Sequence, residues 1–500
     1  MLVSRASGIL LHPTSLPGPY GLGGLGREAR EFLDFLAEAG QRLWQVLPLG
    51  PTGYGNSPYQ SFSSQAGNPL LIDPGSLAEH GMLPEDAAAG SPDFPLERVD
   101  YGAAITYKTE ILRQAWAHFQ SRETPGAAQA AFRDFRARER GWLEDFALFM
   151  ALKAYFAPRG RPVWSDWPRG VARRRPEALT AWHRRLEPEI RFAEFQQFLF
   201  YLQWSHLKTY ANRLGIAVIG DIPIYAAHDS ADVWAHQELF HLDDRGRPAL
   251  VGGVPPDYFS ASGQLWGNPL YHWDRLRREG YRYWIERFRA SLRLFDTVRL
   301  DHFRGFESYW AVKADEKTAV RGRWLPGPGK ALFTALEEAL GPLPFIAEDL
   351  GFITPEVEAL KRQLGFPGMK VLQFAFTWEA DNPFLPHNYG SDCVVYTGTH
   401  DNDTTLGWYK SRDKKVRDQV RRYLGRDGHD IVWDLIRAAQ ASTARAAIIP
   451  LQDVLALGTE ARMNLPSRAE GNWEWRFRAD RLNPMLARRL RELSELYGRA

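Results

Sequence analysis

The chain has 500 residues, of which 44% are hydrophobic and 24% are charged, and its formal net charge is +2. This is the composition of a globular protein with enough apolar material for a large core. A net charge so close to zero provides no strong field that would draw the chain to nucleic acid or to an anionic membrane, so a neutral substrate fits better.

The cysteine content and the length of the apolar runs exclude several further classes of protein. Cys393 is the only cysteine, which excludes an intramolecular disulfide and a cysteine-based zinc cluster. The opening segment MLVSRASGILLHPTSLPG is typical of a strand and loop rather than of a signal peptide. No apolar run reaches the ~18 residues of a transmembrane helix. We therefore expect a cytoplasmic protein that does not associate with membranes.

Eight short apolar segments, most of them flanked by Gly or Pro, are predicted as strands. In chain order they are residues 8–11, 43–48, 217–222, 297–301, 345–348, 369–374, 393–397 and 446–451. Helical periodicity accompanies many of them, at residues 27–39, 192–214, 281–292, 330–340 and 355–364. This alternation predicts the α/β class and a (β/α)₈ TIM barrel.

The spacing of the strands is uneven. Roughly 170 residues separate the second strand from the third, far more than one strand–helix unit of a barrel needs. We expect one catalytic domain over residues 1–500, with a mainly helical subdomain inserted at about 75–210 that includes helices over 103–156. Smaller cleft-side insertions are expected at about 236–273 and 305–329. The chain closes with a charged helix over 483–498, and no run of strands after the barrel predicts a C-terminal β-sandwich.

One motif matches a nucleotide-binding pattern but lacks its context. GLGGLG at residues 21–26 precedes a helix, as a dinucleotide fingerprint does. The turn before it is long, and the next strand, LWQVLPLG, provides no acidic residue for a ribose. We therefore do not expect nucleotide binding, and no redox or metal cofactor is expected.

The strand of residues 297–301 ends in a charged pair. Arg299 and Asp301 are two residues apart, so both side chains point to the same face of the strand. A neighbouring guanidinium orients a carboxylate and favours its ionised form, which suits a nucleophile. An ion pair inside the barrel with no catalytic role explains this segment equally well.

Two further carboxylates follow apolar strands. Glu348 comes directly after PFIA, and a carboxyl in a partly dry pocket beside an ionised Asp has a raised pKa, which suits a general acid and base. Asp349 is the competing candidate for this role. Asp401 follows the seventh strand together with His400, where both could contact sugar hydroxyls and a cationic transition state. Asp221 ends the third strand, where a structural role and a substrate contact are equally plausible.

These strand-end residues resemble the motifs of the α-amylase superfamily of retaining glycosidases, and within it the 4-α-glucanotransferases (amylomaltases, or disproportionating enzymes). The resemblance covers the chain from end to end. It rests on the segments SGILLHPTSLPGPYGLGGLG (7–26), WQVLPLGPTGYGNSPYQSFSSQAGNPLLID (44–73), GDIPIYAAHDSADVW (220–234), GVPPDYFSASGQLWGNPLYHW (253–273), RLDHFRGFESYW (299–310) and YTGTHDNDTTLGWY (396–409).

The resemblance implies a role for each site residue. Asp301 would be the nucleophile, Glu348 the acid and base, and Asp401 the stabiliser of the transition state. The residues implied in substrate binding are Tyr59, Ser57, Asp221, Arg299, His400 and Asn464, with Gly252 in a flexible loop over the cleft (252–256), Trp266 for stacking and Tyr54 in a second glucan contact.

The activity expected from these residues is transfer of α-1,4-glucan segments to the 4-OH of an acceptor, with cyclic glucans formed when a chain attacks itself. The expected partners are α-1,4-glucans and maltooligosaccharides, and no obligate protein partner is inferred. The same three carboxylates also serve an α-glucan hydrolase, which is the main alternative. The missing β-sandwich and the segment GQLWGNPLYHW favour the transferase. A non-catalytic glucan-binding scaffold is a third possibility, disfavoured by the complete set of carboxylates.

Overall fold

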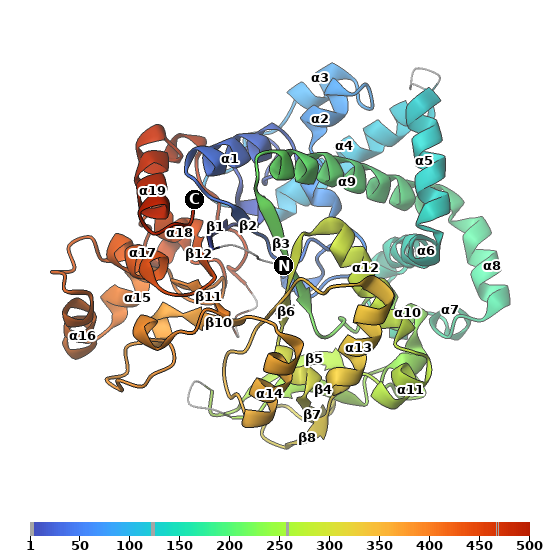
Figure 1. Ribbon diagram of the computed structural model, residues 1–500. Helices are drawn as coiled ribbons and strands as arrows, with labels where there is room; N and C mark the ends of the chain where they lie inside the picture. The colour runs from blue at the N-terminus through green and yellow to red at the C-terminus, as the bar shows by residue number, and fades with distance from the viewer. Residues whose placement is uncertain (1–4, 122–125, 257–259, 467, 469) are drawn as a thin grey trace.

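The computed structural model describes residues 5–121, 126–256, 260–466, 468 and 470–500, apart from the side chain of Tyr54. At its centre lies an eight-stranded parallel sheet in the order β10-β11-β12-β1-β2-β3-β6-β9 (Figure 1). In chain order the strands are β1 (Ala6–Leu10), β2 (Leu43–Gln45), β3 (Ala217–Pro223), β6 (Thr297–Asp301), β9 (Phe345–Ala347), β10 (Gly368–Val371), β11 (Cys393–Tyr396) and β12 (Ala446–Pro450). All eight predicted strands contribute to it, and the predicted TIM barrel is confirmed.

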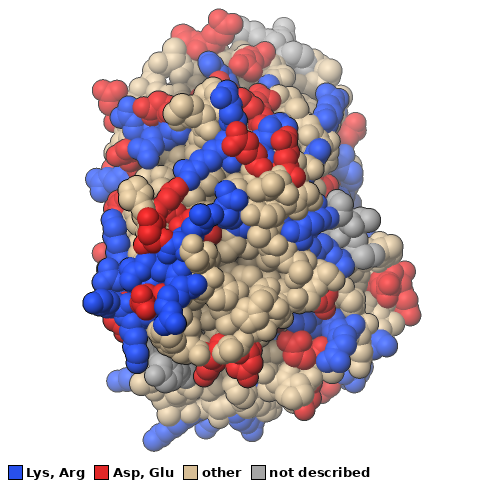
Figure 2. Space-filling view, turned by 60° about the vertical axis from the view of Figure 1, so that its left-hand side comes forward, with Lys and Arg blue, Asp and Glu red and all other residues tan. Residues whose placement is uncertain are grey.

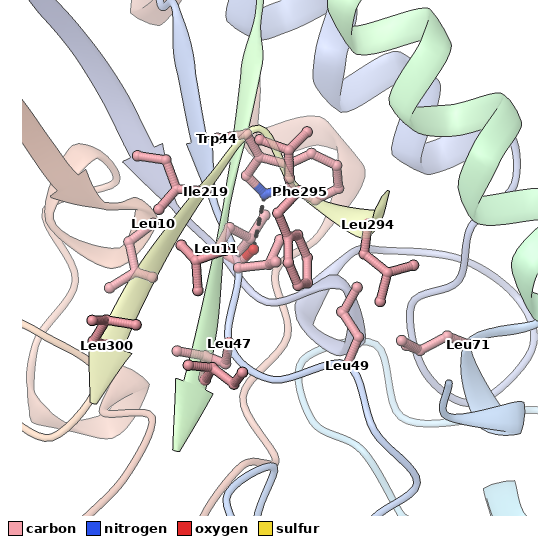
Figure 3. Packing of buried hydrophobic residues seen from close by; sticks show 14 of the residues in the cluster. Leu10, Leu11, Trp44, Leu47, Leu49, Leu71, Ile219, Leu294, Phe295 and Leu300 are labelled. Carbon is pink, nitrogen blue, oxygen red and sulfur yellow. Dashed lines mark hydrogen bonds between the residues drawn. The ribbon is translucent and has the colours of Figure 1, made fainter. Parts of the chain in front are cut away.

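The barrel forms because its strands are apolar on both faces. β1, β2, β11 and β12 are buried at every residue, as expected for parallel strands covered by helices. Figure 3 shows Leu10, Trp44, Ile219 and Leu300, from four neighbouring strands, packed close together. The indole Nε1 of Trp44 donates to the carbonyl of Leu11 at 2.9 Å, so the one polar atom of this ring is satisfied.

The two ends of the strand order, β9 and β10, close the barrel without a regular ladder between them. The Ala347 N–H donates to the Pro367 carbonyl at 2.9 Å, and the Met369 N–H donates to Oδ1 of Asp349 at 2.6 Å. β10 is also shorter than the predicted 369–374, because Leu372–Phe374 turns into a 3₁₀ helix. This junction lies directly beside Glu348.

Helices cover the outside of the barrel (Figure 1). The α1 helix buries Phe32, Leu33, Phe35 and Leu36, a stripe at helical spacing that faces the strands. The longer helices of this layer are α1 (Arg27–Glu38), α9 (Glu187–Arg213), α12 (Arg282–Leu294), α13 (Gly329–Leu340), α14 (Pro355–Leu364), α16 (Lys414–Leu424), α17 (Ile431–Ala441) and α19 (Pro484–Leu496). The shorter ones are α10 (Ala231–Ala235), α11 (Trp273–Arg278), α15 (Thr405–Ser411) and α18 (Leu451–Val454).

Between β2 and β3 the chain is helical. It forms α2 (Pro74–Glu79), α3 (Glu85–Ala89), α4 (Tyr101–Gln120), α5 (Gly126–Arg138), α6 (Arg140–Phe156), α7 (Arg169–Ala172) and α8 (Pro176–Arg185) before α9 returns to the barrel. Aromatic side chains join these helices to α9, as in the pair Phe119 and Phe195, whose ring centroids lie 4.7 Å apart. The division of the chain into a barrel and an inserted subdomain at about 75–210 stays a prediction.

The two segments predicted as smaller insertions contain a sheet that the sequence analysis did not predict, and their status as insertions stays a prediction. β4 (Leu250–Val254), β5 (Gln264–Pro269), β7 (Ser308–Lys313) and β8 (Gly322–Pro326) pair antiparallel in the order β5-β4-β7-β8. Residues 252–254, expected in a flexible loop, are therefore strand residues, because their backbone pairs with β7 on one side and β5 on the other.

Charge is spread over the surface in both signs. Figure 2 shows cations and carboxylates interspersed on one face, around a broad area of uncharged residues. This agrees with the formal net charge of +2. Within the described part of the chain, no helix is long and apolar enough to span a membrane.

Candidate active site

The candidate residues lie at one end of the barrel. β3 contains Asp221, β6 ends at Asp301, and β9 is followed at once by Glu348. β11 leads into the loop that carries His400 and Asp401. Because the carboxyl ends of parallel barrel strands meet at the same mouth, these side chains converge there.

Arg299 is the centre of the site. Its Nη1 donates to both carboxylate oxygens of Asp221, at 2.9 and 2.7 Å, and to Oδ1 of Asp301 at 2.9 Å. Its Nη2 lies 4.0 Å from Oε2 of Glu348. Burial disfavours the charge of the guanidinium, but the carboxylates of Asp221 and Asp301 hold the Arg299 pKa well above its usual range. The pairing with Asp301 expected from the sequence is present.

Asp221 lies behind the site, where its side chain has no solvent exposure. In addition to Arg299, its carboxylate accepts a hydrogen bond from the hydroxyl of Tyr59 at 2.8 Å. The Tyr59 ring in turn stacks on His400, with ring centroids 5.1 Å apart. Of the two roles left open by the sequence, this geometry favours the structural one, in which Asp221 positions Arg299 and Tyr59.

Glu348 is held at both carboxylate oxygens. Oε2 accepts from the backbone N–H of His302 at 2.7 Å, and Oε1 accepts from the N–H of Leu350 at 3.0 Å. His302 reaches this position in a left-handed conformation, with φ +53°. Burial, reinforced by the charge of Asp301, raises the Glu348 pKa from 4.5 to about 7, although Arg299 and the two backbone bonds oppose the shift.

Asp349, the competing candidate for the acid, serves another purpose. Its Oδ2 pairs with the ammonium of Lys361, and its Oδ1 accepts from the N–H of Met369 across the β9–β10 junction. The side chain is 3% exposed. Both oxygens are thus engaged inside the protein, which leaves Glu348 as the acid/base candidate.

Asp401 is the most accessible of the candidate carboxylates, with a side chain 48% exposed. Oδ1 accepts from Nδ2 of Asn464 at 2.6 Å and lies 3.4 Å from Nε2 of His400. Nη2 of Arg462 donates to the Asp401 carbonyl at 2.6 Å, and its Nε donates to the carbonyl of Asn464 at 2.8 Å. The carboxylate is therefore oriented by the protein while it remains open to a ligand.

The antiparallel sheet brings two further predicted residues to the site. Trp266, in β5, meets the His302 ring edge to face, with centroids 4.8 Å apart. Gly252, in β4, lies against the ring of Tyr225, where a Cβ would come within 2.7 Å of a ring carbon. A side chain at position 252 would displace that ring, so glycine is required there by close approach.

The segment around Tyr59 includes the remaining predicted residues. Oγ of Ser57 accepts from the N–H of Tyr59 at 3.3 Å, so Ser57 helps to fix the backbone of Tyr59. The Tyr54 side chain lies outside the described part of the chain, and its second glucan contact stays a prediction.

Three residues of the site were missed by sequence reasoning. His302 acts through its backbone N–H, and the Arg462 guanidinium donates to the backbone carbonyls of Asp401 and Asn464, contacts that no motif reveals. Asp453 accepts from the Thr397 hydroxyl at 2.5 Å and from the N–H and hydroxyl of Thr405, at 2.7 and 2.6 Å. Its place three residues after β12 was the available signal, since the other site carboxylates also follow barrel strands. In the described residues, no group of three or more His, Cys, Asp or Glu is arranged to hold a metal ion.

Comparison with known proteins identifies the family. The sequence model of the 4-alpha-glucanotransferases matches residues 11–482. The chain belongs to this family. The 4-alpha-glucanotransferases of Thermus thermophilus and of a Synechocystis species are each 54% identical to it, over 99% and 100% of this chain and 99% of each relative.

Solved structures agree with this assignment. The amylomaltase of Streptococcus agalactiae, in complex with acarbose, matches with a TM-score of 0.95 and 40% identity, over 99% of this chain and all of the other. The amylomaltase of Corynebacterium glutamicum, at 20% identity and a TM-score of 0.79 over 99% of this chain and 74% of that one, shares the fold. The chain is a 4-alpha-glucanotransferase in both sequence and architecture.

Proposed function

We propose that this 4-alpha-glucanotransferase moves α-1,4-glucan segments to the 4-OH of an acceptor glucan or glucose by a retaining double displacement. The observation that carries the proposal is the position of Arg299, whose guanidinium bonds to Asp301 and lies beside Glu348. One cation thus holds a nucleophile and an acid/base at the same barrel mouth. Two carboxyl groups in these two roles are what retaining glycosidic chemistry needs.

In the first step Asp301 attacks the anomeric carbon of the donor. Its Oδ1 accepts from Arg299, which leaves Oδ2 to form the new bond to carbon. The glycosidic C–O bond breaks, and the proton of Glu348 passes to the leaving oxygen. The raised pKa of Glu348, about 7, supports this role because it keeps the carboxyl protonated in mildly acidic to neutral solution.

The second step reverses the roles. The Glu348 carboxylate takes the proton of the acceptor 4-OH, the resulting oxygen attacks the anomeric carbon, and the bond to Asp301 breaks. The anomeric centre is inverted twice, so its α configuration is retained. Both protein groups return to their initial protonation states.

Asp401 supports the cationic transition state in both steps. Its carboxylate is accessible, and Asn464 and Arg462 fix its direction. A preoriented negative charge stabilises positive charge that develops on the sugar ring. His400, stacked on Tyr59, is placed to donate a hydrogen bond to a sugar hydroxyl.

Transfer requires that an acceptor sugar, rather than water, reaches the intermediate. The antiparallel sheet with Gly252 and Trp266 lies beside the acid, with Trp266 against His302, and is the element suited to cover the cleft. When the far end of the bound chain acts as acceptor, the product is a cyclic glucan.

Incubation with pure maltotriose tests the activity. Transfer yields glucose together with maltotetraose and longer chains, which chromatography resolves. Glucose and maltose alone would indicate a hydrolase, and unchanged maltotriose would indicate a binding protein. With α-maltosyl fluoride as donor, the first product should be the α anomer by NMR, and a β anomer would contradict retention.

The nucleophile is tested by Asp301→Ala. We expect turnover of maltotriose to fall by roughly 10⁴-fold or more, because no other group can form the covalent intermediate. The variant should fold, since the Asp301 side chain is 28% exposed and Arg299 keeps Asp221 as a partner. Substantial residual turnover in a folded variant would reject Asp301 as nucleophile.

A further inference from the structure

Phe352 is a large apolar side chain that the mechanism above does not use, although it lies close to the acid. It is 71% exposed and follows Glu348 by four residues, in the loop between β9 and α14. Single exposed apolar residues are common on protein surfaces, so exposure alone assigns it no role. Its surroundings distinguish it.

The position of Phe352 is fixed relative to both catalytic loops. At the start of its loop, Oε1 of Glu348 accepts from the Leu350 N–H at 3.0 Å, so the chain turns back over the carboxylate. At its end, Nη1 of Arg304 donates to the Phe352 carbonyl. Arg304 follows Asp301 by three residues, which ties the exposed ring to the nucleophile's loop as well as to the acid's.

Arg304 also backs the exposed ring with a stack of planar groups. Its guanidinium lies 3.7 Å from the ring centroid of Trp324, in β8, and 5.4 Å from that of Phe352. The Trp324 ring rests edge to face on Trp310 of β7 at 5.2 Å. Arg304 is buried between two aromatic rings, so it is an ordered support for the exposed ring of Phe352.

We propose that Phe352, supported by Arg304 and Trp324, is a stacking platform for the glucose units on the acceptor side of the scissile bond. The inference rests on the proposed function. Glu348 donates its proton to the leaving sugar and takes one from the incoming sugar, so the chain that continues from Glu348 borders that side. A glucose ring presents an apolar C–H face and a rim of hydroxyls, which matches an exposed aromatic face with cationic backing.

This placement predicts that Phe352 affects the acceptor and not the bond cleavage itself. α-Maltosyl fluoride separates the two, because its leaving fluoride makes no acceptor-side sugar contact. Fluoride release reports formation of the covalent intermediate. With maltose added as acceptor, the amount of maltotetraose formed per fluoride released reports how the intermediate is divided between sugar and water.

For Phe352→Ala we expect the apparent KM for the maltose acceptor to rise about fivefold, the effect of losing one aromatic contact. Hydrolysis should increase at the expense of transfer, and kcat/KM for fluoride release should stay at the wild-type value. Phe352→Tyr should restore the acceptor KM, because the ring face remains. Met485→Ala, at a residue 77% exposed on α19, is the matched control and should change nothing.

An unchanged acceptor KM in Phe352→Ala would overturn the inference, as would an equal loss of fluoride release and transfer. Neither result would affect the proposed function, which fails instead if maltotriose yields only glucose and maltose, or if folded Asp301→Ala retains substantial fluoride release. The two hypotheses are therefore tested by different variants in the same assay.

Discussion

The guanidinium of Arg299 contacts the carboxylates around it unequally. Asp221 and Asp301 bond directly to Nη1 of Arg299, whereas Glu348 lies 4.0 Å from Nη2 and takes its hydrogen bonds from the backbone. Burial, reinforced by the charge of Asp301, raises the pKa of Glu348 to about 7, and burial also raises the pKa of Asp221 although that carboxylate bonds directly to Arg299. The direct hydrogen bond to Arg299 distinguishes the proposed nucleophile from the proposed acid, which has none.

At the scale of this one residue, the Glu348 pKa predicts a pH dependence. Cleavage of a natural glucan needs protonated Glu348, so kcat/KM for maltotriose should fall as pH rises through about 7. A fluoride leaving group needs no proton, and kcat/KM for α-maltosyl fluoride should not show this limb. Rate profiles for both donors between pH 5 and 9 provide the measurement. An identical basic limb for both donors would assign it to another group.

The raised pKa of Glu348 also makes the free energy of unfolding depend on pH. A carboxyl with a raised folded-state pKa favours folding most below its ordinary value of 4.5, and this contribution is lost as pH rises through about 7. Glu348→Gln, which cannot ionise, should lose that part of the pH dependence of unfolding.

At the scale of an element, the loop of residues 398–404 is fixed at both ends by one buried carboxylate. Asp453 bonds to Thr397, at the end of β11, and to Thr405, at the start of α15. Arg462 and Asn464 then hold the Asp401 that lies between. The orientation of the proposed transition-state stabiliser therefore depends on a residue that meets no substrate.

Asp453→Asn tests this dependence with almost no change of shape. The amide provides one acceptor oxygen where the carboxylate provides two, so a buried donor loses its partner at a cost of about 1–3 kcal/mol. We expect kcat to fall about tenfold through misplacement of Asp401, with a smaller change in KM. Steady-state kinetics and thermal unfolding measure both effects.

Thr405→Ser is the control for this loop, because it keeps the hydroxyl and the backbone N–H and should retain kcat. A destabilised Asp453→Asn protein with wild-type kcat would show that the loop holds its own shape.

Sequence reasoning succeeded with some elements and failed with others for a physical reason. The barrel strands are apolar on both faces, a pattern that stands out against their Gly and Pro boundaries, and every one was found. β4 and β8 are short and contain Gly or Pro. β4 pairs with β7, which lies about 60 residues further along the chain. The pairing of β4 with β7, which joins the two segments into one sheet, depends on contacts that no local pattern records.

The site shows the same division. Asp301, Glu348 and Asp401 were predictable because strand ends in a barrel converge. The roles of His302 and Arg462 were not, because the backbone N–H of His302 bonds to Glu348 and the Arg462 guanidinium bonds to the backbone carbonyl of Asp401. That Asp221 is closed to solvent also required the structure, since burial of a strand-end residue depends on Tyr59 and Arg299.

At the scale of the whole molecule, Arg499 links separate segments of the chain at the end of the barrel opposite the mouth. This guanidinium is fully buried and donates to the carbonyls of Gln440, Ala444 and Ala6, at 2.7, 2.9 and 3.1 Å. Its contacts connect β1 with the segment between α17 and β12. No single pair of strands contains all of these carbonyls.

Arg499→Ala should therefore destabilise the fold without touching the chemistry. Loss of the guanidinium removes several buried, charge-assisted hydrogen bonds to carbonyls, although Arg5 still donates to those of Gln440 and Ala444. We expect the loss to cost ~3 kcal/mol and to shorten the half-life at elevated temperature. Maltotriose turnover at moderate temperature should stay near the wild-type rate. Arg478→Ala, which removes an exposed ion pair with Asp480, should change neither quantity. Equal thermal half-lives for the two variants would contradict this role.

The junction between β9 and β10 has a consequence for motion at the catalytic mouth. The Ala347 to Pro367 hydrogen bond and the Asp349 carboxylate join the two strands where the other neighbours in the barrel share ladders. The β9–β10 junction therefore has fewer backbone hydrogen bonds than a laddered pair of strands. Glu348 and Asp301 lie on the same side of it, because β9 and β6 share a ladder and the Glu348 N–H donates to the Leu300 carbonyl at 3.1 Å. A slight parting of β9 from β10 would thus carry acid and nucleophile together and keep the spacing between them.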